Sequence, residues 1–262
     1  MIRIIKDGIS IDGDNIIMNT DSDSPNDLLN IVNVKICKAD FIGNTYYFGY
    51  YFNENASSKQ RTMILRWLKN IDGSGIDENS LRKFIRKPLM YLNNTTENLL
   101  DFNCLIYPKS DRSNLTHIIV NEIYKLTSHD MKRKNAEIVK SLPSKIDFDW
   151  ESFVADNEWR LDDNGFKQVK EYIYNTLLPH IHDLTYFSLA KEVKYRYRPY
   201  IKNYLVFKDK ESEELVKAIQ KGKILIVDDI NTSGSTLTEI LRLVHNINNS
   251  CEIYIFTLIG KE

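Results

Sequence analysis

The chain has 262 residues, with 42% apolar residues, 27% charged residues and a net charge of −1. This length suits one large domain, or a core with one appended lobe. The near-zero net charge gives no bulk attraction to nucleic acid, so composition disfavours a nucleic-acid partner.

The spacing of the cysteines and the length of the apolar runs indicate the cellular compartment in which the protein works. Cys37, Cys104 and Cys251 are far apart and form no CxxC or His cluster, which argues against a disulfide framework or a zinc site. The amino terminus has no long apolar segment, and no run approaches the roughly 18 residues that span a bilayer. We therefore expect a protein of the reducing cytoplasm, neither exported nor embedded in a membrane.

Residues 1–95 are expected to form a β-rich lobe with short helices. Two runs rich in β-branched and aromatic residues, 31–36 and 46–52, predict strands. Helical spacing of apolar residues predicts a helix over 57–70, and a shorter one over 79–84 that ends before Pro88. The remaining residues, 96–262, are assigned to a core.

The core begins with a predicted buried strand over 102–107 and a helix from Leu115. Between them, the segment 108–114 carries Lys109, Arg112 and several small hydroxyls close to the start of the helix. Basic groups at a helix N-terminus indicate an anion site. A surface turn with solvated charges is the alternative.

A long insertion, 128–210, separates this part from the next strand. Helical periodicity predicts helices over 130–142, 148–155 and 164–178, the last beginning with an Asn cap and ending before Pro179. His180 and His182 lie beside Asp183. Their i, i+2 spacing on a helix would point the rings to different faces, so no metal site is expected there.

The end of the insertion, 191–207, alternates basic and tyrosine residues. An exposed strand with solvated charges and a stacking surface for single-stranded nucleic acid both fit this alternation.

The run 223–237 points to a ligand class. Four apolar residues, 224–227, predict a strand buried on both faces, and Asp228 and Asp229 follow at its carboxyl end, where open α/β sheets bind ligands. The hydroxyl and glycine loop 232–236 then opens a predicted helix. Loop amides and the helix dipole form a phosphate cradle, and two adjacent carboxylates suit ribose hydroxyls or a magnesium ion.

Two other phosphate-binding motifs are excluded. No Gly-Lys-Ser/Thr closes the run, as a Walker loop requires, and a single glycine after an acidic pair does not fit the Rossmann fingerprint. The alternative without function is a buried strand followed by a chance acidic pair and a capped helix.

Residues 224–236 resemble the binding motif for 5-phosphoribosyl-1-pyrophosphate (PRPP) of the type I phosphoribosyltransferases, and every element of that motif is present. The resemblance implies an α/β fold, with a phosphoribosyltransferase-like parallel sheet flanked by helices beside the β-rich lobe and the insertion. It implies that Asp228 and Asp229 hold the ribose 2′ and 3′ hydroxyls. The residues implied to wrap the 5′-phosphate are Thr232, Ser233, Gly234, Ser235 and Thr236.

The segment 108–114 resembles the pyrophosphate loop of the same family. Lys109 and Arg112 would stabilise the leaving pyrophosphate, and Ser110 would contribute to binding. Mg²⁺ is the implied cofactor, with Asp228 and Asp229 as its candidate ligands. By its position, 191–207 resembles the hood loop that closes over the ligand.

The implied activity is transfer of the phosphoribosyl group of PRPP, or of a related ribose 5-phosphate nucleotide, to a nitrogen acceptor with release of pyrophosphate. A homodimer is also implied. The alternative is a non-catalytic PRPP or nucleotide sensor that acts with a partner protein or nucleic acid.

Two departures from the family pattern affect the acceptor. Thr232 stands where enzymes acting on 6-oxopurines have an acidic residue, which argues against hypoxanthine or guanine. The sequence also stops soon after the last predicted strand, 252–258, where many relatives continue into a base-recognising segment. Any base recognition is therefore expected from the lobe or the insertion.

Overall fold

A computed structural model describes most of the chain. The described residues are 8–12, 15–19, 32–52, 56–70, 75–95, 100–110, 113–127, 134–231 and 233–260, with the backbone alone described over 8–12, 15–19, 32–38 and 94–95.

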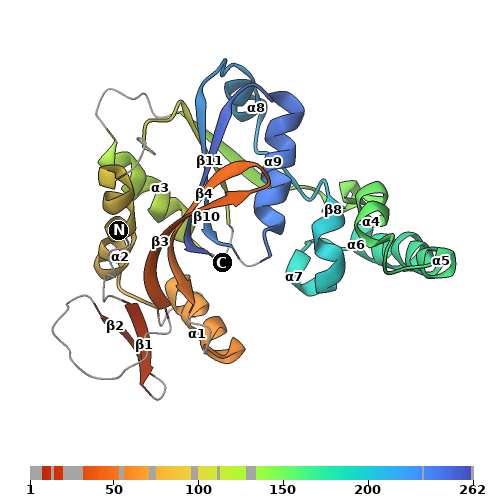
Figure 1. Cartoon of the computed structure of the whole chain (residues 1–262), viewed down its shortest axis with the longest axis horizontal. Coiled ribbons are helices and arrows are strands. Elements are labelled where there is room, and N and C mark those ends of the chain that lie inside the picture. Colours follow the sequence, from red (N-terminus) through yellow and green to blue (C-terminus); the bar gives the residue numbers. More distant parts are fainter. Residues whose placement is uncertain are drawn as a thin grey trace.

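The centre of the structure is a nine-stranded sheet in the order β2-β1-β3-β4-β11-β10-β5-β6-β9 (Figure 1). Its five central strands, from β4 to β6 in that order, are parallel, whereas β1, β2, β3 and β9 pair antiparallel. The strands are β1 Gly8–Asp12, β2 Asn15–Asn19, β3 Val32–Phe41, β4 Asn44–Phe52, β5 Cys104–Pro108, β6 Asn135–Lys140, β9 Leu205–Phe207, β10 Lys223–Ile230 and β11 Glu252–Gly260.

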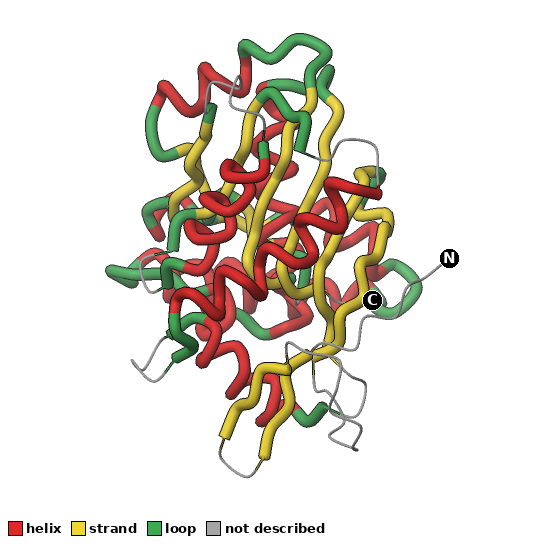
Figure 2. The backbone as a smooth tube through the Cα atoms, turned by 90° about the vertical axis from the view of Figure 1, so that its left-hand side faces the viewer, coloured by secondary structure: helices red, strands yellow, loops and turns green. Residues whose placement is uncertain are grey.

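Helices cover both faces of this sheet, as the backbone tube in Figure 2 shows. They are α1 Ser58–Leu68, α2 Glu78–Thr95, α3 Leu115–Leu126, α4 Trp150–Asn157, α5 Asp163–Tyr172, α6 Leu178–His182, α7 Leu189–Glu192, α8 Lys210–Lys217 and α9 Ser235–Ile247. A small second sheet pairs β7 Asp147–Phe148 with β8 Ile201–Lys202. The α/β fold with a mostly parallel sheet flanked by helices confirms the fold class expected from the sequence.

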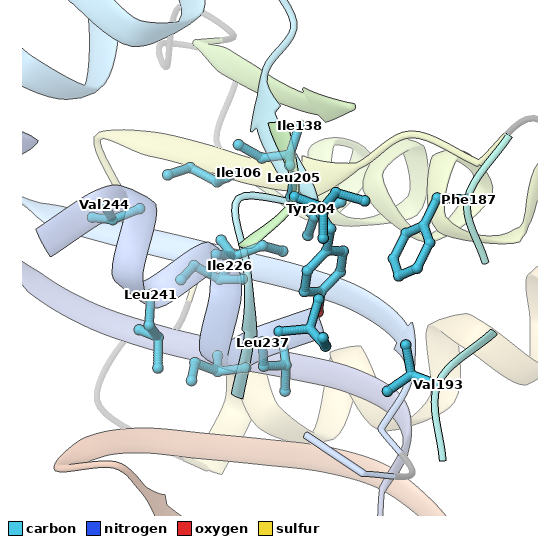
Figure 3. Packing of buried hydrophobic residues seen from close by; sticks show 14 of the residues in the cluster. Ile106, Ile138, Phe187, Val193, Tyr204, Leu205, Ile226, Leu237, Leu241 and Val244 are labelled. Atoms are coloured by element: carbon cyan, nitrogen blue, oxygen red, sulfur yellow. The ribbon is translucent and has the colours of Figure 1, made fainter. Parts of the chain in front are cut away.

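Strand β10 shows why the sheet is buried on both sides. Leu225 and Val227 point to one cluster, shared with α1, α2 and α3, and Ile224 and Ile226 point to the other. Figure 3 shows this second cluster, in which Ile226 packs against Leu237 and Leu241 of α9. Alternate side chains therefore lie in opposite layers, as expected for a parallel strand between helices.

The amino-terminal strands belong to the same sheet as the core. β4 pairs in parallel with β11, with Tyr47 opposite Phe256. The division of the chain into units 1–95 and 96–262 stays a prediction. The strands of both parts belong to one continuous hydrogen-bonded sheet.

The helix predicted to end before Pro88 continues through it, so that prediction was wrong. α2 runs from Glu78 to Thr95 with Pro88 inside. A proline leaves the carbonyl four residues earlier without its helical partner. Here the Tyr50 hydroxyl donates to that carbonyl, on Phe84, at 2.7 Å, and Gly49 leaves room for the proline ring.

The insertion also differs from its prediction. Residues 135–140, expected within a helix over 130–142, form β6 between β5 and β9, while 128–133 lie outside the described residues. Short apolar runs fit either element, and pairing on both sides favours the strand. The helix expected over 164–178 begins after an Asp162 cap and runs through a π-helical turn, 173–177, and past Pro179 to His182.

Candidate ligand site at the carboxyl edge of the sheet

The acidic pair ends the central strand at the edge where ligands bind open sheets. Asp228 and Asp229 lie near the end of β10, and only 7% and 6% of their surfaces are exposed. The neighbouring strand β11 pairs its Thr257 with Asp228. Both carboxylates are thus buried at the place that the sequence predicts, but they face opposite layers: Asp229 faces α1, whereas Asp228 lies on the side of Tyr46 and Tyr204.

The surroundings of Asp228 disfavour the charged form of its side chain. Its burial, together with the neighbouring Asp229 carboxylate, raises the pKa of Asp228 to about 8, against the opposing effect of Lys69. One Asp228 oxygen accepts the backbone N–H of Asp229 at 2.8 Å. Burial therefore favours the protonated form of the Asp228 side chain, which donates a hydrogen bond as well as accepting one.

Asp229 has a cationic partner that the sequence reasoning missed. The Lys69 ammonium lies 3.0 Å from Oδ1 and 2.8 Å from Oδ2 of Asp229, so it contacts both carboxylate oxygens. Lys69 is the C-cap residue of α1, which follows β4 and lies beside the carboxyl ends of the strands (Figure 1). The two residues are 160 positions apart, and no local pattern indicates the pair.

A tyrosine network supports the end of β10. The hydroxyls of Tyr46 and Thr257 are 2.7 Å apart, and the Asn231 amide donates to the Tyr46 hydroxyl at 3.3 Å. Burial raises the pKa of Tyr46 above its usual range. The Asn231 backbone N–H also donates to the Ile259 carbonyl at 2.9 Å, so this network and β11 together fix where the phosphate loop begins.

The predicted phosphate loop has the backbone such a loop requires. Gly234 adopts a left-handed conformation with φ of 76°, directly before α9, and the hydroxyls of Ser233 and Ser235 lie 3.0 Å apart. A Cβ on Gly234 would lie 3.0 Å from the Phe41 ring. The amides of the first turn, at Ser235 and Thr236, have no intrahelical acceptor and are available to an anion. Thr232 lies outside the described residues.

The second predicted anion segment sits on the adjacent strand. β5 pairs in parallel with β10, with Ile106 opposite Ile226, and continuing this register brings Lys109 level with Asp229. Lys109 and Ser110 are exposed, and the Lys109 N–H donates to the Ile138 carbonyl at 2.7 Å. Arg112 lies outside the described residues.

The segment 191–207 is not one continuous strand: it contains helical turns and the short strands β8 and β9, and some of its tyrosines are buried while Lys194 and Arg196 are exposed. Residues 195–200 form a 3-10 helix, and Tyr197 and Tyr204 are buried in the cluster beside α9 (Figure 3 labels Tyr204). Arg242 of α9 donates to the Asn203 side chain at 3.0 Å. The 3-10 helix contradicts a strand over 195–200, whereas the exposed Lys194 and Arg196 agree with solvated charges. A hood role for the segment stays a prediction.

The acidic pair does not fit a directly bound magnesium ion as it stands. Asp229 is engaged by Lys69, and Asp228 is buried with a raised pKa. Within the described ranges, no group of three or more His, Cys, Asp or Glu side chains could hold a metal. His180 instead lies 3.1 Å from Glu192, and the His182 Nε2 lies 2.8 Å from the Ile146 carbonyl.

Comparison with known proteins gives little at the sequence level. No family model and no curated protein matches the chain. It is similar to the crystal structure of a hypoxanthine phosphoribosyltransferase from Staphylococcus aureus, with 10% identity and a TM-score of 0.35. The match covers 71% of this chain and 65% of that one, less than two thirds of its length. The matched protein bears the name of the class that residues 224–236 resemble, but at this TM-score the similarity carries no weight for the site.

One further observation concerns membranes: none of the helices within the described ranges has the length and apolar character to cross a bilayer.

Proposed function

We propose that the chain binds PRPP at the carboxyl edge of β10 and transfers its phosphoribosyl group to a nitrogen acceptor, with release of pyrophosphate. One observation supports this most strongly. A buried acidic pair near the end of β10 is followed, in the same strand–loop–helix segment, by a left-handed glycine at the N-terminus of α9. Ribose hydroxyls and a 5′-phosphate, separated by a few ångströms in the ligand, need those two kinds of partner next to each other.

Different residues would bind the different chemical groups of the ligand. Asp228 and Asp229 would receive the ribose hydroxyls, and Ser233, Ser235 and Thr236 would bind the 5′-phosphate. Lys109, at the end of the adjacent strand, would face the pyrophosphate, and Arg112 would join it from the same loop. A cation placed there stabilises the charge that develops on a leaving pyrophosphate.

The reaction is a substitution at C1 of the ribose. The acceptor nitrogen forms the new bond to C1 while the bond from C1 to the pyrophosphate oxygen breaks, and pyrophosphate leaves with the electron pair. The acceptor nitrogen loses its proton to solvent. The sugar is cationic in the transition state, so the Asp229 side chain would stabilise it, and most of the remaining acceleration would come from positioning. A magnesium ion arriving with the ligand would supply neutralising charge for the pyrophosphate.

A second function uses the same site without turnover. Lys69 already neutralises Asp229, which reduces the negative charge left to stabilise a cationic sugar. This favours a protein that binds PRPP or a nucleotide as a signal and passes it to a partner protein or nucleic acid.

Calorimetric titration with PRPP and magnesium, followed by pyrophosphate release across bases and small amines, tests both functions. Asp228→Asn with Asp229→Asn should weaken PRPP binding by about 100-fold or more, because both hydroxyl acceptors are altered. The matched control is Glu213→Gln with Glu214→Gln, a surface acidic pair on α8 that should bind as the wild type does.

Binding with pyrophosphate release supports the transferase. Binding without release from any acceptor supports the sensor. If the wild-type chain does not bind PRPP, or if the double Asn variant binds it equally well, both functions are contradicted.

A further inference from the structure

Lys69 is the feature that the proposed function does not explain. The family resemblance covers neither α1 nor any other part of residues 1–95, yet α1 delivers a cation to the acidic pair. Its ammonium contacts both oxygens of Asp229, whose side chain is 8% exposed, while 27% of the Lys69 side chain is exposed.

The position of Lys69 follows from the sheet order. β4 is the parallel neighbour of β11, and β11 is the neighbour of β10, so α1, which follows β4 in the chain, lies close enough to the acidic pair for Lys69 at its C-terminal end to contact Asp229. The Ser57 capping box fixes the start of α1, and Ile64 and Leu68 bury one of its faces. Lys69 is thus held against Asp229 by elements that are themselves well fixed.

A contact of this kind leaves room for a ligand. An ionised carboxylate has about four acceptor positions, and the ammonium uses one on each oxygen. The other acceptor positions on Asp229 stay available to sugar hydroxyls.

We propose that Lys69 is the resident cation of the acidic pair, and that it lets the pair bind the hydroxyls of a ribose 5-phosphate group without a protein-bound divalent metal. This inference rests on the proposed function, because it assumes that a phosphorylated ribose occupies the site. Lys69 acts as a positioning residue: its contacts with both oxygens fix the orientation of the Asp229 carboxylate, and its charge offsets the repulsion between the acidic pair and an anionic ligand.

Ribose 5-phosphate is the probe that separates this role from metal binding, because it lacks the pyrophosphate that carries magnesium. The dissociation constant of the wild-type chain, measured by calorimetry, should be the same in EDTA and in magnesium chloride. Lys69→Met should weaken binding in EDTA by about tenfold, which corresponds to about 1.4 kcal/mol. Magnesium should restore much of this loss, because the vacated carboxylates can then hold the ion.

Two variants and one control make the test specific. Lys69→Arg retains the charge and should bind close to the wild type, whereas Lys69→Gln retains a donor without the charge and should follow Lys69→Met. Lys69→Gln also serves if the Met variant does not fold. Lys59→Met removes an exposed lysine from the same helix and should leave binding unchanged.

The results distinguish failure of this inference from failure of the proposed function. Wild-type binding that appears only with magnesium, or Lys69→Met and Lys69→Gln variants that bind normally in EDTA, would overturn the role of Lys69 while leaving PRPP binding intact. A wild-type chain that binds neither ribose 5-phosphate nor PRPP, with or without magnesium, would overturn the proposed function and this inference together.

Discussion

Two buried carboxylate clusters in this molecule are built differently. Glu122 of α3, whose side chain has no exposed surface, is surrounded by Arg82, Arg86 and Lys125 between α2 and α3. Those cations more than offset its burial and hold the pKa of Glu122 below its usual range. At the end of β10, two carboxylates share one cation, Lys69, and the pKa of Asp228 rises instead.

The difference indicates which cluster still has hydrogen-bond acceptor positions with which to bind a ligand. A carboxylate with three cationic partners has its charge and acceptor positions satisfied, and such a cluster joins two helices. A pair with one cation keeps hydrogen-bond acceptor positions at an edge where ligands bind, and perturbed pKa values gather at such sites. This contrast, more than burial itself, separates the structural cluster from the candidate site.

The largest effect on stability is expected at the Glu122 cluster. Glu122→Gln leaves three cations around a neutral amide and should lower the free energy of unfolding by about 3 kcal/mol. Urea denaturation measures this loss, and PRPP affinity should be unchanged. Glu78→Gln is the matched control, because Glu78 contacts Arg82 from an exposed position and should change stability by about 0.5 kcal/mol or less. A Glu122 variant as stable as the wild type would remove the contrast between the clusters.

A smaller effect should appear in the pH dependence of stability. A carboxyl whose pKa is raised on folding binds its proton more tightly in the folded state, so stability is greatest below the usual carboxyl range and falls as pH rises towards about 8. Stability should therefore decrease as pH rises from about 5 to about 8.

Asp228→Asn should flatten the slope of stability against pH, because the amide resembles the protonated carboxyl and does not titrate. Thermal unfolding of both proteins across this pH range gives the comparison. Parallel curves for wild type and variant would show that Asp228 is ionised in the folded state. The same substitution at Asp77, an exposed carboxylate before α2, should leave the slope nearly as it is.

The smallest effect concerns the loop beside the acidic pair. Gly234→Ala should lower stability by about 1 kcal/mol, because the left-handed backbone disfavours a Cβ and the new atom would meet the Phe41 ring. In a Phe41→Leu background the contact is relieved and the φ strain remains, so part of the loss should return. Gly165→Ala, in the first turn of α5 without positive φ, is the control and should cost less, because its new Cβ would meet only the side chains of Asp162, at 3.1 Å, and Leu161, at 3.3 Å. Equal effects at the two glycines would contradict a strained phosphate loop.

The sequence predicted the elements that carry the candidate site, because their signals are local. Four apolar residues before Asp228, and apolar residues at helical spacing after Gly234, define β10 and α9 within 25 residues of chain. The strand before Lys109 and the helix from Leu115 were predicted for the same reason, and all four elements lie where they were expected.

The predictions that were wrong depended on distant partners. Residues 135–140 became a strand because β5 and β9 pair with them on either side, and α2 continues through Pro88 because Tyr50 satisfies the carbonyl that the proline leaves unpaired. Neither partner is visible in a window of sequence around those residues. Local propensity is a weak prior, and tertiary pairing overrides it.

The sequence by itself determined the order of strand, acidic pair, glycine loop and helix, since backbone sterics and periodicity act over a few residues. Only the tertiary structure decided that β4 lies next to β11, and therefore that α1 brings Lys69 to Asp229 across 160 residues. The charge balance of the acidic pair depends on that contact. Coulombic interaction depends on distance in space, and spacing along the chain does not encode it.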